Sequence, residues 1–327
     1  MLTREDHNAL NYKLAVNMVD RSEKVFITGH NGMLGSKTLQ VFRDRGFTSI
    51  ITADRSRLDL KNQLAVDDFF SNHQPSYVIH IAAKVGGINA NINAPASFLY
   101  DNLIMQANVI NAAYKNGVKK FIFIASSCIY PKFSPQPMLE EYLLDGKPEP
   151  TNESYAIAKI AGVKMLEAYK KQYGFNSLTL VPSNLYGPND SFDLEHAHVL
   201  SSLVKRFADA KKQNLDTVTL WGTGIAKREF LHTDDFAMAI LYFLDRDIPH
   251  DYINVGPGKD ISIFDLASMI AKKTGYKGRI FWDDSKPDGM LRKCMDVSKM
   301  LNEHFVPLKT LEQGVEEMII NYNNWQQ

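Results

Sequence analysis

A tyrosine and a lysine four residues apart suggest proton-transfer chemistry. Tyr155 and Lys159 stand in SYAIAKIAG, and this spacing puts both side chains on one face of a helix. A phenol with an ordinary pKa of about 10 is a weak acid at neutral pH, so we expect the Lys159 ammonium group to lower the pKa of Tyr155. Ser126 ends the apolar run KKFIFIAS, where its hydroxyl is placed to bond a carbonyl group being reduced. A chance pairing of Tyr155 with Lys159 is the alternative.

Three glycines directly follow the apolar run KVFIT. Gly29, Gly32 and Gly35 form a GxxGxxG pattern at the start of an expected helix, which is the context of a phosphate-binding turn. Glycines allow a tight turn and a close approach of backbone N–H groups to a pyrophosphate, and the helix N-terminus favours the anion. A tight turn without a ligand is the alternative, but the surrounding strands and helices favour a dinucleotide.

The segment TADRSRLDL, after the second expected strand, bears on which dinucleotide binds. Asp54 would accept the ribose hydroxyls of NAD, whereas Arg55 and Arg57 offer planar cations to the 2′-phosphate of NADP. We predict NADP(H) as the cofactor, with Arg55 as a phosphate contact; the alternative is that the arginines are solvated loop charges. Asp59 is a candidate partner for the adenine amine.

Short β-rich runs alternate with helical patterns from residue 24 onward. This order predicts an α/β fold with a Rossmann-type, doubly wound parallel sheet, and a smaller C-terminal α/β region for the substrate. We expect residues 1–22 to form an extension outside the core. Residues 23–182 should form the NADP-binding domain, which later segments also join, and residues 183–327 should be mainly substrate-binding.

Composition excludes several classes of function. The chain has 327 residues, 45% of them hydrophobic, and a formal net charge of zero. Balanced charge gives no field that would recruit nucleic acid or a membrane surface. Without a signal peptide or a long apolar run, a cytoplasmic location is expected. The two cysteines, Cys128 and Cys294, lie far apart without metal-ligand spacing, so we predict no disulfide and no metal site.

Four longer segments together resemble the GDP-L-fucose synthase family of extended short-chain dehydrogenases: SSCIYPK, EPTNESYAIAKIAG, PSNLYGPND and WGTGIAKREFLHTDD. The resemblance extends from residue 24 to about residue 297 and implies a homodimeric, NADP(H)-dependent enzyme. Members epimerise GDP-4-keto-6-deoxy-D-mannose at C3 and C5 and then reduce C4. The resemblance makes Ser126, Tyr155 and Lys159 the reductase triad.

The same resemblance makes Cys128 and His198 the acid–base pair of the epimerisation. Hydrogens at C3 and C5 are adjacent to the C4 ketone, so they can be removed through an enolate. A thiol and an imidazole have ordinary pKa values of about 8.5 and 6.5, which suits one to remove a proton and the other to return one. Packing is the alternative role for Cys128. His196 is the rival of His198.

Further contacts are implied by the resemblance alone. The expected cofactor contacts are Gly29, Gly32, Met33, Leu34, Gly35, Arg55, Asp59, Ala82, Ala83 and Lys159. The expected substrate contacts are Asn184, Arg206, Trp221, Arg228 and Lys286. The chain departs from the family pattern at Asn31, where relatives can carry an arginine for the 2′-phosphate, and at Ser201 and Met290–Leu291 in the substrate region.

Other functions remain open at this stage. The first is a 4-reductase of a related GDP-4-keto deoxy sugar or heptose, with or without epimerisation. A 4,6-dehydratase is disfavoured because Ser127 and Cys128 stand where that class carries Asp-Glu. A catalytically silent NADP-binding regulator is the distant alternative, since fold does not fix function. A homodimer would pair the long helices that follow Ala96 and Glu153.

Overall fold

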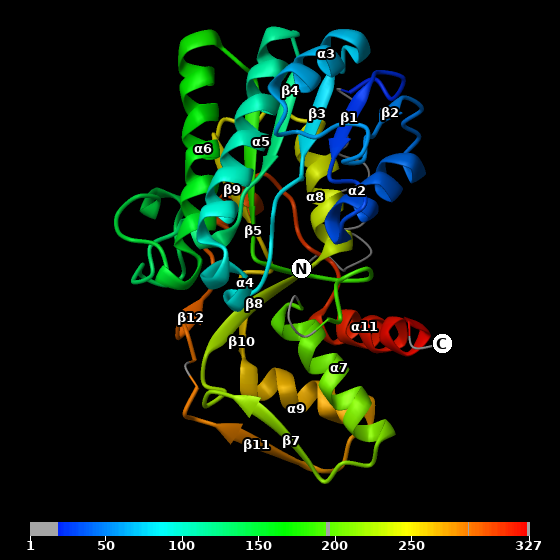
Figure 1. Ribbon diagram of the computed structural model, residues 1–327, viewed down its shortest axis with the longest axis vertical. Helices are drawn as coiled ribbons and strands as arrows, with labels where there is room; N and C mark the ends of the chain where they lie inside the picture. Colours follow the sequence, from blue (N-terminus) through cyan, green and yellow to red (C-terminus); the bar gives the residue numbers. More distant parts are fainter. Residues whose placement is uncertain (1–18, 194–196, 287, 326–327) are drawn as a thin grey trace.

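A six-stranded sheet forms the upper half of the molecule (Figure 1). The computed structural model describes residues 19–193, 197–286 and 288–325. Neighbouring strands of this sheet are all parallel. The doubly wound, Rossmann-type sheet predicted from the sequence is therefore confirmed. In spatial order the strands are β2 (Ile50–Ile51), β1 (Val25–Thr28), β3 (Tyr77–His80), β4 (Lys120–Ile124), β5 (Ser177–Pro182) and β9 (Tyr252–Val255).

Helices cover both faces of this sheet because successive strand residues alternate between two apolar cores. Val25 and Ile27 of β1 pack in one core with residues of α2 and α8, whereas Phe26 packs in the other with residues of α3, α5 and α6. The helices on or beside the sheet are α2 (Met33–Asp44), α3 (Gln63–His73), α4 (Ile88–Asn93), α5 (Pro95–Lys115), α6 (Glu153–Tyr173), α8 (Thr233–Leu244) and α10 (Ser298–Asn302).

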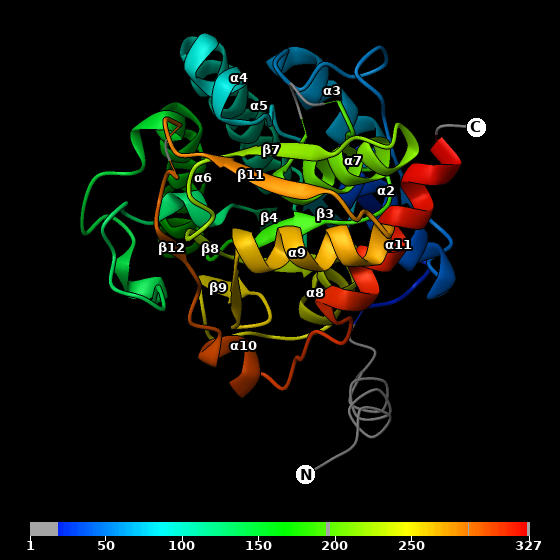
Figure 2. The same ribbon diagram turned by 90° about the horizontal axis from the view of Figure 1, so that it is seen from below.

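A smaller α/β region lies below the large sheet, and Figure 2 shows it from below. Its central strand β8 pairs with β6, β10 and β12, while β7 and β11 form a separate parallel pair. Its strands are β6 (Asn184–Tyr186), β7 (Thr217–Trp221), β8 (Lys227–His232), β10 (Asp260–Ser262), β11 (Arg279–Asp283) and β12 (Arg292–Lys293). Its helices are α7 (Val199–Lys212), α9 (Ile263–Thr274) and α11 (Leu311–Trp325), around a third apolar core.

The start of the described chain is anchored to the large sheet. Val19 is 3% exposed and packs in the same core as β1, and Arg21 forms an ion pair with the buried Asp245. The expectation that residues 1–22 lie outside the core is therefore wrong for Val19, because its apolar side chain fills that core; residues 1–18 lie outside the described residues. None of the described helices is long and apolar enough to cross a membrane.

Candidate active site

The glycine turn joins β1 to α2 at the carboxyl edge of the sheet. A Cβ on Gly35 would lie 1.9 Å from the Gly29 carbonyl oxygen, and a Cβ on Gly29 would lie 2.9 Å from the backbone of Ala82. Gly29 also adopts a φ of +70°, which favours glycine. The turn therefore needs glycine at both positions, because neither approach leaves room for a side chain.

The residues of this turn fit a dinucleotide pyrophosphate. Gly32 precedes α2 without a side-chain cap, and the first turn of α2, which contains Met33 and Leu34, carries no acidic residue. The helix therefore presents N–H groups and the positive end of its dipole without a competing carboxylate. Ala82 and Ala83, the other expected contacts, follow β3 beside this turn and are half-buried.

Thr28 and His80, which the sequence reasoning missed, fix this edge of the sheet. The Thr28 Oγ1 accepts from the N–H groups of Ile81 and Ala82 at 3.0 Å, and lies 3.0 Å from His80 Nδ1. Since both N–H groups donate to it, the hydroxyl hydrogen is left to donate to the imidazole. Burial, aided by the charge of Lys159, lowers the pKa of His80 to about 3, so the ring is a neutral acceptor. A threonine and a histidine ending adjacent strands were the available signal.

The turn after β2 has a shape that favours the arginines over Asp54. Oδ1 of Asp54 accepts from Ser56 Oγ at 2.7 Å and from the Arg57 N–H at 3.0 Å. These bonds, the Ser56 side chain foremost, lower the pKa of Asp54. Arg55 and Arg57 are exposed. Asp59 is half-buried, and its Oδ1 accepts from the Lys61 N–H at 3.1 Å. Asp54 therefore bonds within its own turn, and Arg55 and Arg57 are exposed to solvent.

Ser126 and Lys159 both lie at the carboxyl end of β4. Lys159 is 2% exposed, and its ammonium group donates to the Ile124 carbonyl at 2.7 Å. Its Nζ lies 5.9 Å from the ring centroid of Tyr155, one turn earlier on α6. Ser126 begins the 3-10 helix Ser127–Ile129 that follows β4, and its Oγ accepts from the Cys128 N–H at 3.4 Å. Strand β4 and helix α6 thus gather residues from two separate motifs.

The pKa of Tyr155 is shifted in the direction opposite to the one expected. Burial raises it, and the charge of Cys128 raises it further. Burial also lowers the pKa of Lys159 to about 8. The expectation that Lys159 lowers the phenol pKa is wrong, because the shift is upward and its causes are the burial of the phenol and the charge of Cys128. Tyr155 therefore keeps its proton near neutrality, which is the form that a proton donor needs.

Cys128 lies close enough to charged side chains for them to affect its pKa. The thiol is 6% exposed, and burial raises its pKa, whereas Lys293, the Ser126 hydroxyl and Lys159 act to lower it. Lys293, on β12, was not among the candidates predicted from the sequence. Burial lowers its pKa, and the charge of Cys128 counteracts this effect. A lysine in the RK pair after PDG was the only signal. The thiol is therefore coupled to two lysines that partly offset the effect of burial, but the net shift keeps the thiol protonated.

His198 immediately precedes α7 and pairs with a carboxylate. Its Nδ1 lies 3.0 Å from Oδ1 of Asp190, whose side chain is 4% exposed. The Asp190 hydrogen bond raises the pKa of His198 against the opposing effect of burial. Ser201, on the first turn of α7, donates from its Oγ to Oδ2 of the same carboxylate. His196, the rival candidate, lies outside the described residues.

Four expected substrate residues lie in the smaller region on or beside β6, β7 and β8. Lys286 Nζ lies 5.8 Å from the ring centroid of Trp221, which is 61% exposed at the end of β7. The Arg228 guanidinium donates to the carbonyls of Met290 and Asp288, and burial lowers its pKa. The Asn184 side chain donates to the Glu229 carbonyl at 2.8 Å. An exposed aromatic ring beside cations suits a nucleotide base and its phosphates.

The remaining expected residue, Arg206, is half-buried on α7. Its Nε donates to Ser202 Oγ at 3.4 Å, one turn earlier on that helix. Arg206 therefore shares α7 with Ser201, which bonds the carboxylate paired with His198, whereas Trp221 ends β7 with Lys286 beside it. The structure places the two groups on different elements of the smaller region, and joint contact with one substrate stays a prediction.

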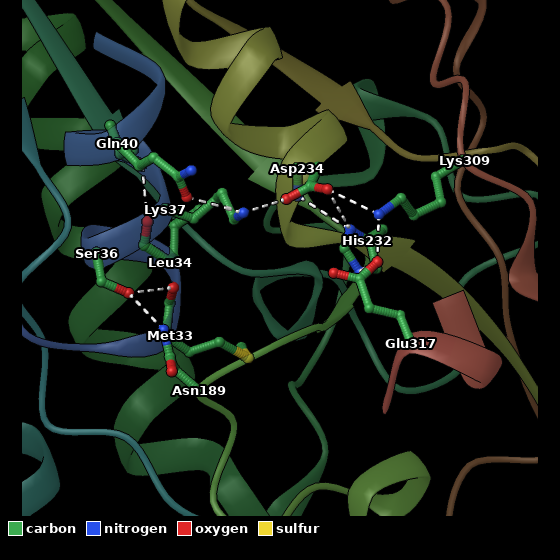
Figure 3. A network of polar contacts seen from close by, with 11 residues as sticks. Met33, Leu34, Ser36, Lys37, Gln40, Asn189, His232, Asp234, Lys309 and Glu317 are labelled. Atoms are coloured by element: carbon green, nitrogen blue, oxygen red, sulfur yellow. Dashed lines mark hydrogen bonds and ion pairs between the residues drawn. The ribbon is translucent and has the colours of Figure 1, made fainter. Parts of the chain in front are cut away.

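His232, Asp234 and Glu317 lie close enough together to hold a metal ion, but lysines form ion pairs with both carboxylates (Figure 3). Lys309 contacts both carboxylates, at 2.7 Å from Asp234, and Lys37 of α2 lies 2.9 Å from Asp234. Burial lowers the pKa of His232 to about 4. Two ammonium groups already neutralise the two carboxylates, so we interpret the cluster as an ion-pair network between the two regions.

The Rossmann-type sheet, the glycine turn and the group of Ser126, Tyr155 and Lys159 are together typical of enzymes that bind a dinucleotide. The sequence profile of the NAD dependent epimerase/dehydratase family matches residues 25–256. The chain is 47% identical over 300 residues to GDP-L-fucose synthase 1 of Arabidopsis thaliana, covering 92% of this chain and 93% of that protein. It is 46% identical over 304 residues to GDP-L-fucose synthase of Escherichia coli, covering 90% and 94%.

A solved structure agrees with these relatives. The GDP-L-fucose synthetase of Naegleria fowleri bound to NADP superposes with a TM-score of 0.87 at 27% identity, covering 95% of this chain and 96% of that one. The chain belongs to the NAD dependent epimerase/dehydratase family. Its relatives at 46–47% identity include GDP-L-fucose synthases from a plant and a bacterium.

Proposed function

We propose that this protein converts GDP-4-keto-6-deoxy-D-mannose to GDP-L-fucose, by epimerisation at C3 and C5 and NADPH-dependent reduction at C4. The observation that carries the proposal is the grouping of Ser126, Cys128, Tyr155 and Lys159 at the carboxyl end of β4. A reductase needs only the serine, tyrosine and lysine. The thiol coupled to this triad supplies a second proton carrier, which a reductase without epimerisation does not need.

In the reduction, each member of the triad has one role. Bound NADPH supplies the hydride. Ser126 donates a hydrogen bond to the C4 ketone oxygen and polarises it. Tyr155, whose raised pKa keeps it protonated, transfers its proton to that oxygen. Lys159, held by the Ile124 carbonyl, stabilises the negative charge that then develops on the phenol oxygen.

The epimerisation uses the same ketone as an electron sink. Removing a proton from C3 or C5 gives an enolate, whose oxygen Ser126 and Tyr155 stabilise. Cys128 and His198 form the pair that removes one proton and returns another to the opposite face. The raised pKa of His198 favours its protonated form as the acid. The charges of Lys293 and Lys159 counteract the burial that raises the pKa of Cys128, and they would stabilise the thiolate when the thiol gives up its proton.

The cofactor assignment and the division of the chain are parts of the same proposal. Residues 23–182, joined by β9 and α8, bind NADP(H), and residues 183–327 supply most substrate contacts. Arg55 would hold the 2′-phosphate of the cofactor. A cytoplasmic location is consistent with two cysteine thiols that form no disulfide.

A homodimer through α5 and α6 completes the proposal. These two long helices pack against each other on one face of the large sheet. Tyr100 on α5 and Ile157 on α6 are 62% and 43% exposed, so apolar area remains for a second copy. Light scattering should give the mass of two 37.0-kDa chains. A mass of one chain would contradict the dimer.

The proposed function is tested by incubating the protein with NADPH and GDP-4-keto-6-deoxy-D-mannose in deuterated water. NADPH absorbance reports the reduction, and NMR of the product reports deuterium. Consumption of NADPH with deuterium at both C3 and C5 of GDP-L-fucose is the expected result. Consumption without deuterium would indicate a 4-reductase without epimerisation. Cofactor binding without either signal would indicate a silent homologue or a different sugar.

A further inference from the structure

Asp190 is a buried carboxylate whose two oxygens both have partners. Oδ1 lies 3.0 Å from Nδ1 of His198 and accepts from the Ser191 N–H at 2.9 Å. Oδ2 accepts from Ser201 Oγ. Three hydrogen-bond partners hold the carboxylate in one orientation, and its side chain is 4% exposed. A buried carboxylate of this kind is an acceptor at each oxygen, so the His198 nitrogen that faces it must donate.

This contact determines which nitrogen of His198 carries a hydrogen in the neutral ring. With Nδ1–H donated to Asp190, the second hydrogen of the imidazolium form resides on Nε2. The protonated ring is stabilised by the adjacent negative charge, in the same direction as the raised pKa of His198. Among the described residues, Asp190 is the charged group that shifts this titration. The geometry thus leaves Nε2 as the nitrogen that exchanges a proton with a ligand.

We propose that Asp190, anchored by Ser201, is the positioning residue that fixes the Nδ1–H form of His198 and makes Nε2 the proton-donating atom of the epimerisation. The inference rests on the proposed function. In the step it describes, the Nε2–H bond breaks and a C–H bond forms at the enolate carbon, whose electron pair takes up the proton. The ring becomes neutral while Nδ1 keeps its hydrogen, and a proton from water restores the imidazolium.

The test is Asp190→Asn, read out by NMR of labelled histidine side chains in the whole protein. The signal of His198 is assigned with His198→Asn. An amide cannot stabilise the imidazolium as a carboxylate does, so the His198 pKa should fall by about one unit or more. Deuterium entry at C3 and C5 should slow roughly tenfold or more above that pKa, and its decline at high pH should begin at a lower pH.

Two controls separate positioning from folding. Asp235→Asn changes another buried carboxylate, which accepts from the Lys309 N–H at 2.8 Å, and should leave the His198 titration unchanged. Calorimetric NADPH affinity shows that each variant is folded. Ser201→Ala keeps the Asp190 contact and should move the His198 pKa less than Asp190→Asn does.

The outcomes are distinguishable. A lowered His198 pKa with slowed deuterium entry in Asp190→Asn supports the inference. An unchanged pKa and unchanged exchange in this variant, with exchange intact in the wild type, would overturn it and leave the proposed function standing. No deuterium entry in the wild type would overturn the epimerisation itself, and with it the acid role assigned to His198.

Discussion

At the residue scale, burial rather than the nearest charge decides the protonation of the site. Tyr155 and Cys128 both have raised pKa values because the protein removes water from their anions, and Lys159 has a lowered one for the same reason. The free protein therefore holds a protonated phenol beside a lysine whose pKa is about 8. This state suits reduction, which begins with a proton on the tyrosine.

Tyr155→Phe removes the proton donor and keeps the ring. We expect ketone reduction to fall by about 10²-fold or more, because general acid catalysis is lost. NADPH affinity, measured by calorimetry, should change little. Tyr173→Phe, on the same helix but 46% exposed at its end, is the matched control. Wild-type turnover in Tyr155→Phe would contradict the assignment of the triad.

Glu229 is a second buried group with a shifted pKa. It is 1% exposed and accepts from the N–H groups of Gly258 at 2.7 Å and Met295 at 2.9 Å. Burial raises its pKa from 4.5 to about 7. A raised pKa in the folded state means that the associated stability is complete below the unfolded value of 4.5 and is lost as pH rises through 7.

Glu229→Gln should therefore alter how stability depends on pH. The variant should be less stable by about 1–3 kcal/mol at pH near 5, because its NH₂ group must face a backbone N–H. The difference from wild type should shrink near pH 8, where the wild type has lost its protonated carboxyl. Urea unfolding at the two pH values checks this, with Glu316→Gln, on the exposed face of α11, as control. An equal difference at both pH values would contradict the prediction.

At the element scale, the join between β1 and α2 depends on the absence of two side chains. Gly35 lies against the Gly29 backbone, and Gly29 lies against the backbone of Ala82 after β3. Thr28 and His80 tie the ends of β1 and β3 together at the same place. The edge proposed for the pyrophosphate is thus built from close backbone contacts, which have less freedom to move than side chains have.

Gly35→Ala should lower the free energy of unfolding by about 1–3 kcal/mol even without cofactor, because its Cβ would overlap the Gly29 carbonyl. NADPH affinity should fall as well, since α2 must shift from the turn. Gly32→Ala is the matched variant: its Cβ would lie 3.5 Å from the same oxygen, an ordinary contact. Its unfolding free energy should stay within about 1 kcal/mol of wild type. Equal unfolding free energies for the two variants would contradict this account.

At the scale of the whole molecule, an ion-pair network joins the large sheet to the smaller region. Lys37 comes from α2, Asp234 from α8 and Glu317 from α11 (Figure 3). His232, at the end of β8, lies 3.6 Å from Asp234 and 3.5 Å from Glu317. The network therefore links α2 and α8, which pack on the large sheet, to α11 of the smaller region.

Lys309→Met should destabilise the protein by about 1–2 kcal/mol, since it leaves two half-buried carboxylates without their shared cation. The pKa of His232, which Lys309 lowers, should rise in this variant. Thermal unfolding and histidine NMR check the two effects. Lys273→Met, which breaks a pair with the exposed Glu316, should change stability by less than about 0.5 kcal/mol. Two variants of equal stability would contradict a joining role for the network.

The sequence by itself determined the order of strands and helices, the glycine turn and the shared helix face of Tyr155 and Lys159. These features follow from local periodicity and backbone sterics, which neighbouring residues fix. The tertiary structure alone decided that the charge of Lys293 acts on Cys128, 165 positions away, and that burial raises the pKa of Tyr155. It also decided that the Asp190 carboxylate lies against Nδ1 of His198. Charge coupling and desolvation depend on which distant segments pack together, and no local pattern encodes that packing.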